Sequence, residues 1–246
     1  NKKLHRRMSV RSVRADANDK LSSLYDLLTD ITGEGCPERS IIFVNHRESA
    51  ERVHDYLRKR GVDSVLYHGA LEQRDRETAI ALFNSGARPI LVATDLAARG
   101  LDIRNVKNVV HYHQALSPEA YTHRNGRTAR VDERGDIYIL LGPEEELKEY
   151  VEHSTGYSVS PSHKAKLSSG IAVLYISAGK REKLSRGDIL GFLTKQVGIP
   201  GAAIGKIEVF DHYSLVALPE EDAPEVVRVS RDVKIKGEKR KVSILK

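Results

Sequence analysis

Hydrophobic residues in the first part of the chain alternate between stretches with helical spacing and short apolar runs. Leu21, Leu24, Leu27 and Leu28 have helical spacing, and Asn18 is placed to cap that helix. Further helices are expected at residues 50–57, 79–83 and 118–123, and strands at residues 41–44, 65–67, 90–93, 109–112 and 137–141. Apolar strands that alternate with helices predict a parallel sheet covered on both faces, with ligands at the carboxyl ends of the strands.

The pattern changes after residue 156. Residues 157–169 are rich in serine and have no hydrophobic period, so they are expected to form a linker. Beyond them, strands are expected at residues 171–176, 206–210, 213–218 and 242–245, with helices at 189–197 and 224–229. This βαββαβ order predicts a small α+β domain of the RRM-like (ferredoxin-like) type over residues 170–246.

The first pattern predicts an α/β domain over residues 20–156. Residues 1–19 are assigned to a segment that leads in from a missing upstream domain. The chain opens at Asn1, enters a basic run at once and has its single methionine at Met8. We therefore expect the sequence to be part of a longer protein.

Composition and charge narrow the class of protein. With 40% hydrophobic and 30% charged residues the chain is globular in composition, and no apolar run reaches the roughly 18 residues that cross a bilayer. The single Cys36 excludes a disulfide framework and a zinc site, which favours a reducing, cytoplasmic location and no bound metal of this kind. Residues 1–160 contain 24 Lys and Arg against 24 Asp and Glu, whereas residues 161–246 contain 16 against 10. This asymmetry favours a polyanionic partner for the tail, although a solvated surface gives the same count.

Residues suited to a functional site are most concentrated in two strings, residues 94–102 (TDLAARGLD) and residues 123–130 (HRNGRTAR). Arg127 and Arg130 are three positions apart, so a helical turn would place both guanidinium groups on one face. Two fixed cations on one face suit a polyphosphate. A single surface arginine is ordinarily only a solvated charge, but four cations within eight residues favour a binding site.

These strings resemble helicase motifs. Residues 94–102 resemble motif V of superfamily 2 helicases, and residues 123–130 resemble motif VI in its DEAD-box form, His-Arg-x-Gly-Arg-Thr-x-Arg. Residues 41–45 resemble motif IV, and residues 67–76 resemble the segment that follows it. The resemblance implies the second RecA-like domain of a DEAD-box RNA helicase over about residues 20–150. Asn125 and Ala129 depart from the usual Ile and Gly, and the consequence for packing at Asn125 is open.

The resemblance also implies roles for individual residues. Arg127 and Arg130 would reach the γ-phosphate of ATP, Asp102 with Gly100 would lie at the ribose, and His123 would couple the nucleotide and RNA clefts. The implied RNA contacts of this domain are His46, Gly69, Arg76 and Thr94.

A phosphate-binding loop and an Asp-Glu-Ala-Asp string are missing from the sequence. The nearest candidate, residues 201–207, is one residue too short and ends in Ile207 where Ser or Thr is needed. The resemblance therefore implies that ATP with Mg²⁺ is bound mainly by an upstream RecA-like domain. This chain alone is expected to be inactive.

The tail carries two basic loops that are candidates for gripping an RNA backbone. Their cations are Lys180, Arg181, Lys183 and Arg186 in the first loop and Lys234, Lys236, Lys239 and Arg240 in the second. Tyr175 and Tyr213 are the only aromatics on the expected central strands, and stacking on bases or packing is open for both. The tail resembles the C-terminal domain of the bacterial DbpA branch of DEAD-box proteins. That implies a helicase directed to large-subunit ribosomal RNA during ribosome assembly. The protein is also expected to be a monomer.

Two other functions remain open. The chain could be a non-enzymatic RNA-binding or annealing module in which the RecA-like part is a scaffold. A DNA-translocating superfamily 2 motor is a weaker option, because the tail has the pattern of an RNA-binding domain.

Overall fold

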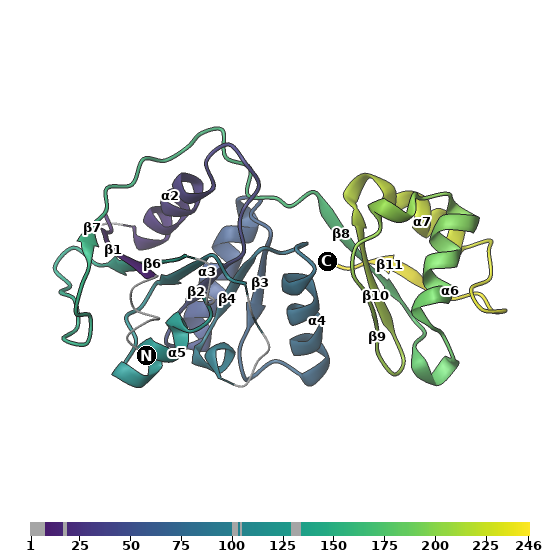
Figure 1. Ribbon diagram of the computed structural model, residues 1–246, viewed down its shortest axis with the longest axis horizontal. Coiled ribbons are helices and arrows are strands. Elements are labelled where there is room, and N and C mark those ends of the chain that lie inside the picture. Colours follow the sequence, from purple (N-terminus) through teal and green to yellow (C-terminus); the bar gives the residue numbers. More distant parts are fainter. Residues whose placement is uncertain (1–7, 17–18, 100–102, 104, 129–133) are drawn as a thin grey trace. The chain divides into compact units, whose positions relative to one another are not determined.

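The computed structural model describes residues 8–16, 19–99, 103, 105–128 and 134–246 (Figure 1). The chain divides into two compact units. The first contains residues 1–84 and 88–169, and the second contains Ser85–Ala87 and Gly170–Lys246. No helix among the described residues is long and apolar enough to cross a membrane.

The first unit is built on a parallel sheet of seven strands in the order β3-β4-β2-β5-β6-β1-β7. Its strands are β1 (Met8–Arg14), β2 (Ser40–Phe43), β3 (Ser64–Tyr67), β4 (Ile90–Ala93), β5 (Asn108–His111), β6 (Gly135–Leu141) and β7 (Thr155–Gly156). Strands β2, β4 and β5 are buried along their whole length. This is why they appear in the sequence as uninterrupted apolar runs.

Helices cover both faces of this sheet, as the sequence predicts. They are α2 (Lys20–Thr32), α3 (Arg47–Lys59), α4 (Gln73–Asn84) and α5 (Pro118–Asn125), with a 3₁₀ turn η1 (Asp95–Ala98). Helices α2 and α3 pack against one side of β6 through Leu140, and α5 packs against the other side through Ile139 and Leu141. Adjacent residues of a strand point to opposite faces, so these helices lie on opposite sides of the sheet.

The helix starts show the expected capping chemistry. The N-cap of α2 is Asp19, whose carboxylate accepts from the backbone of Ser22 at 3.0 Å, so the prediction of Asn18 as the cap was wrong. Helix α5 begins at Pro118 behind Ser117, whose hydroxyl accepts from the backbone N–H of Ala120.

Residues 8–14 form strand β1, which the hydrophobic pattern does not single out. It pairs with β6 from Met8 opposite Gly135 to Arg14 opposite Leu141. Arg11 interrupts the apolar pattern, but its guanidinium donates to the Tyr138 hydroxyl at 2.9 Å and lies over that ring. A charged residue is thus accommodated inside a paired strand.

The segment expected to be a linker is attached to the first unit along its length. We call residues 155–169 the strap. The Tyr157 hydroxyl donates to Asp30 at 2.8 Å, and the backbone of Ser160 donates to the same carboxylate at 3.0 Å. Near the other end, the backbone of Ser169 donates to Asp63 at 2.7 Å. The strap is therefore held to the domain surface by hydrogen bonds from one tyrosine hydroxyl and from its backbone.

The second unit has an antiparallel sheet of four strands in the order β11-β8-β10-β9. The strands are β8 (Ile171–Ile176), β9 (Ile207–Val209), β10 (Ser214–Pro219) and β11 (Val242–Ile244). Its helices are α6 (Arg186–Gly191), continued by a π-helical turn η3 (Phe192–Val197), and α7 (Ala223–Ser230), with 3₁₀ turns η2 (Lys180–Glu182), η4 (Gly201–Ala203) and η5 (Glu220–Asp222). The expected βαββαβ order is confirmed, with one core between the sheet and the helices.

Candidate nucleotide and nucleic-acid interface

Three of the implied RNA contacts of the first unit lie at the carboxyl ends of neighbouring strands. His46 is exposed at the N-cap of α3, Gly69 follows β3, and Thr94 follows β4. The backbone N–H of Thr94 faces the carbonyl of Tyr67 at 3.4 Å, and a Cβ at Gly69 would lie 3.4 Å from the side chain of Leu96. The ends of β3 and β4 thus meet, as a parallel sheet requires.

Arg76 lies in the first turn of α4 and is half-buried. Burial raises the pKa of Tyr67, and the positive charge of Arg76 opposes that rise. In the described part of the chain, Nε of Arg76 has no hydrogen-bond partner. That N–H group is buried, so Arg76 stays a predicted RNA contact only because of its position at this edge of the sheet.

The turn at Gly69 is held by a buried histidine. His68 Nδ1 accepts from the backbone N–H of Ala70 at 3.1 Å, so the ring proton is on Nε2, which faces a carboxylate oxygen of Glu51 at 3.1 Å. Helix α3 thereby fixes the loop after β3, and with it the backbone around Gly69.

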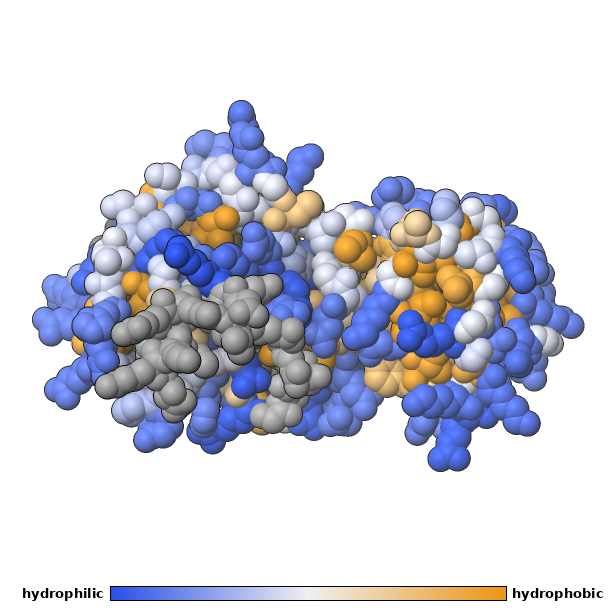
Figure 2. All heavy atoms as spheres, in the orientation of Figure 1, coloured by the Kyte–Doolittle hydropathy of each residue, from blue (hydrophilic) through white to orange (hydrophobic). Residues whose placement is uncertain are grey.

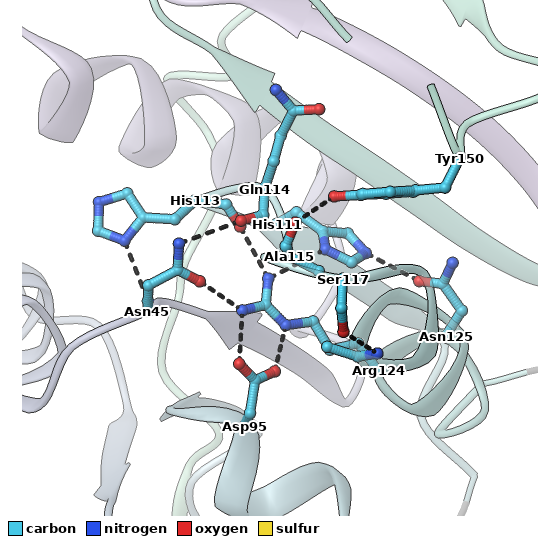
Figure 3. A network of polar contacts seen from close by, with 11 residues as sticks. Asn45, Asp95, His111, His113, Gln114, Ala115, Ser117, Arg124, Asn125 and Tyr150 are labelled. Carbon is cyan, nitrogen blue, oxygen red and sulfur yellow. Dashed lines mark hydrogen bonds and ion pairs between the residues drawn. The ribbon is translucent and has the colours of Figure 1, made fainter. Parts of the chain in front are cut away.

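The centre of the site is Arg124, near the end of α5, which is completely buried (Figure 3). Its guanidinium binds Asp95 through Nε at 2.5 Å and through a second nitrogen at 3.1 Å. It also donates to the carbonyl of His113 at 2.8 Å and to the side chain of Asn45 at 2.7 Å. One side chain thus joins the segments after β2, β4 and β5 to α5.

Asn45 extends this network. Its backbone N–H donates to Nδ1 of His113, and its side-chain N–H donates to the carbonyl of Gln114, both at 3.1 Å. Burial, reinforced by the charge of Lys20, lowers the pKa of His113 to about 4. His113 is therefore a neutral acceptor at physiological pH.

His111, at the end of β5, is also buried against Arg124. Burial and then the charge of Arg124 lower its pKa to about 3, while a hydrogen bond to Asn125 works in the opposite direction. Asn125 is 5% exposed and lies 2.8 Å from Nε2 of His111. The packing at Asn125 that the sequence left open is thus a polar pair.

Arg127 follows α5, which ends at Asn125. Its backbone N–H donates to the carbonyl of Arg124 at 3.3 Å, and that of Thr128 donates to Asn125 at 3.2 Å. Arg127 therefore lies in a turn beyond the helix, and the argument that it shares a helical face with Arg130 does not apply. His123 is exposed in the last turn of α5, whereas Gly100, Asp102 and Arg130 lie outside the described residues.

In the second unit, the first basic loop is fixed to the turn between β9 and β10. The backbone N–H groups of Lys180 and Arg181 donate to the carbonyls of Phe210 and Asp211, both at 2.8 Å. A Cβ at Gly179 would lie only 2.0 Å from the carbonyl oxygen of Phe210, so this close approach requires glycine.

The second basic loop is joined to α6, the helix that follows the first loop, by an ion pair between Lys236 and Asp188 at 3.4 Å. Arg240 was predicted to be one of the cations that grip an RNA backbone, but its side chain is turned to its own loop. Its side chain is 11% exposed, pairs with Glu238 at 3.2 Å and donates to the carbonyl of Ile235, so it stabilises its own loop. The remaining predicted cations are exposed: Lys180, Arg181, Lys183, Arg186, Lys234 and Lys239. In Figure 2 the visible face of this unit is hydrophobic at its centre and hydrophilic around its margin.

Aromatic rings also gather in the second unit. The rings of Phe210 and Tyr213 stack with centroids 4.6 Å apart, and Tyr175 stacks on Tyr213 at 5.7 Å. Tyr213 is 8% exposed, so this ring is chiefly a packing residue.

The hub formed by Arg124, Asp95 and His111 was not selected from the sequence. Two signals pointed to it: a polar His111 ends an apolar strand, and Asp95 lies two residues after the end of another. Neither signal identifies Arg124 as the partner, because Arg124 is 13 positions from His111 and 29 positions from Asp95 in the chain.

Two protein families match the sequence. Residues 19–132 match the family described as helicase conserved C-terminal domain, and residues 173–244 match the DbpA RNA binding domain. The crystal structure of the Escherichia coli DEAD-box protein SrmB, bound to regulator of ribonuclease activity A, is 30% identical with a TM-score of 0.54 and covers 63% of this chain and 94% of that one. A DEAD box protein from Methanococcus jannaschii, 24% identical, has the same fold with a TM-score of 0.56 over 63% of this chain and 43% of that one.

The chain belongs to the DEAD-box family of RNA helicases. Within the family it is similar to the ATP-dependent RNA helicase DbpA of Escherichia coli, with 36% identity over 217 residues that cover 85% of this chain and 48% of the relative. DbpA of Bacillus subtilis is 29% identical over 248 residues, covering 89% of this chain and 52% of the relative. The chain thus spans about half the length of the curated relatives that it matches.

Proposed function

We propose that this chain is the C-terminal part of an ATP-dependent RNA helicase, consisting of the second motor domain and an RNA-binding domain. The observation that carries the proposal is the network at Arg124. It joins the segments that resemble motifs IV, V and VI at the carboxyl edge of one sheet. The same chain carries a second unit with exposed basic loops suited to RNA.

In this proposal, Arg127 and Arg130 approach the γ-phosphate of ATP bound by an upstream RecA-like domain, with Asp102 and Gly100 at the ribose and His123 between the clefts. Arginines placed in this way stabilise the charge that develops on the transferred phosphoryl group. The described residues contain no cluster of acidic or histidine side chains suited to a metal. We therefore assign Mg²⁺ to the upstream domain.

His46, Gly69, Arg76 and Thr94 would bind the RNA backbone, which sets register without reading sequence. The basic loops of the second unit would select a folded RNA, and we propose large-subunit ribosomal RNA during ribosome assembly. We also propose that the protein works in the cytoplasm as a monomer.

The experiment compares this chain alone with a chain that includes the upstream domain. The chain alone should show no ATP hydrolysis above background, and the longer chain should show hydrolysis that RNA stimulates. In the longer chain, Arg130→Ala should lower the rate by about a thousandfold and leave RNA binding by the tail nearly unchanged. RNA binding without any stimulated hydrolysis would favour the annealing module, and turnover by the short chain would contradict the proposal.

A further inference from the structure

His111 and Asn125 form a buried polar pair beside Arg124 (Figure 3). Nδ1 of His111 lies 3.3 Å from a guanidinium nitrogen of Arg124. A guanidinium has only donors, so Nδ1 must be unprotonated and must accept. The proton of the neutral ring is therefore on Nε2.

That proton has one partner among the described contacts of the ring. Nε2 of His111 lies 2.8 Å from Oδ1 of Asn125, and both side chains are buried. An amide oxygen accepts this bond, whereas the isoleucine usual at this place in the motif has no acceptor. Asn125 thus fixes the tautomer that allows His111 to accept from Arg124.

Arg124 and Asn125, the last two residues of α5, also bind the backbone that follows the helix. The carbonyls of Arg124 and Asn125 accept from the backbone N–H groups of Arg127 and Thr128. Any tilt of the end of α5 would therefore be transmitted directly to the backbone of Arg127.

We propose that His111 and Asn125 are a coupled pair of positioning residues that hold Arg124 and, through the end of α5, set the position of Arg127. The inference rests on the proposed function, in which Arg127 acts on the γ-phosphate. Both members of the pair are buried, so we place them behind the site and not in contact with nucleotide or RNA. They act through Arg124.

Three variants isolate the pair. Asn125→Ile removes the acceptor for Nε2. His111→Asn retains an acceptor near the position of Nδ1 but cannot reach Asn125, and the double variant removes both halves of the bond. Thr122→Ala, exposed on the same helix, is the control.

In the chain with the upstream domain, Asn125→Ile should lower kcat about tenfold and leave KM for ATP within about twofold. In the His111→Asn background the same change should cost less than about threefold, because its partner is already missing. Thr122→Ala should leave kcat unchanged. The inference would be overturned if the kcat losses of the two single variants simply multiplied in the double variant. A loss confined to KM or to thermal stability would overturn it as well.

Two measurements on the 246-residue chain do not depend on ATP hydrolysis. The ¹⁵N spectrum should show His111 protonated on Nε2 alone, and Asn125→Ile should speed hydrogen exchange at the amides of Arg127 and Thr128. A ring protonated on Nδ1, or unchanged exchange, would overturn the pairing. Absence of RNA-stimulated hydrolysis in the wild-type longer chain would instead contradict the proposed function and leave these two results standing.

Discussion

At the scale of single residues, Arg124 shows how a charge can be kept in a protein core. Its side chain is completely buried, yet its guanidinium is bound by a carboxylate, an amide oxygen, a backbone carbonyl and an imidazole. The planar fork of arginine suits this set of acceptors, and lysine could not reproduce it. Removing one partner leaves the charge buried without compensation, which costs more than the intact pair contributes.

Asp95→Ala should therefore lower the free energy of unfolding of the first unit by about 3 kcal/mol or more. Denaturation followed by tyrosine fluorescence would measure the change. Glu48→Ala, which breaks a fully exposed pair with Arg47, is the control and should leave the midpoint unchanged. Equal midpoints for both variants would mean that water replaces Asp95 without cost.

Stability should also fall as the pH is lowered from about 7 to 5. Burial lowers the pKa of His111 to about 3 and that of His54 to about 4, below the ordinary value of about 6.5 in the unfolded chain. Between these values the unfolded chain binds protons that the folded chain does not, so stability is complete above about pH 6.5 and is lost on acidification. For His111 the slope is at most about 1.4 kcal/mol per pH unit. Thermal unfolding between about pH 7 and pH 5 measures this dependence of stability on pH. His111→Asn should make the dependence weaker.

At the scale of elements, the strap shows that a sequence without hydrophobic period can still be ordered. Its anchor residues lie on α2 and before β3, and the carboxylate of Asp30 serves two of its groups. The Tyr157 hydroxyl and the backbone amides of serines make these contacts, so hydropathy gives no signal for them. Tyr157 also packs at the edge of the core of the first unit.

Asp30→Ala should release the middle of the strap, because it removes the acceptors of Tyr157 and Ser160 together. Limited proteolysis should then cut between residues 155 and 169 at least several times faster than in the wild type. Glu34→Ala is the matched control, since Glu34 contacts Lys164 of the same strap only through an exposed ion pair. Equal cleavage of the wild type and Asp30→Ala would show that this anchor does not order the strap.

Two glycines of the second unit should respond oppositely to alanine. Gly179→Ala places a methyl group against the carbonyl of Phe210 and should destabilise the unit by about 1–3 kcal/mol. Gly191→Ala meets nothing within 4 Å at helical backbone angles and should be neutral or stabilising by about 0.5–1 kcal/mol. Thermal unfolding of the two variants tests this contrast, and RNA binding should weaken only for Gly179→Ala.

The sequence predicts these elements with uneven success, for physical reasons. The apolar runs identify β2, β4 and β5 because buried parallel strands need no polar face. Strand β1 has no such run, because Arg11 finds its partners on β6. The site follows the same rule: the motifs make Arg127 and Thr94 candidates, but the partners of Arg124 come from three other segments and are defined only by the fold.

At the scale of the whole molecule, the net positive charge belongs to the tail, and six of its exposed cations lie on the two basic loops: Lys180, Arg181, Lys183, Lys234, Lys236 and Lys239. Replacing Lys180, Arg181 and Lys183 together by alanine should reduce the salt dependence of RNA affinity. The slope of log affinity against log salt should fall by up to about three units, since each contact releases roughly 0.7 to 0.9 counterions. Titrations from low to high salt measure it. Arg240→Ala is the comparison, because that side chain is engaged within its own loop.

The placement of β1 has a consequence for how the chain folds. It is the first described strand in the sequence but lies between the last two strands, and Arg11 contacts Tyr138 at a separation of 127 residues. On the ribosome, β1 therefore has no partner until β6 has been synthesised, while β2, β3 and β4 can already assemble. Closing so long a loop is entropically costly and slow. Strand β1 should therefore be the part of this sheet that stays unpaired longest during synthesis and needs protection from aggregation.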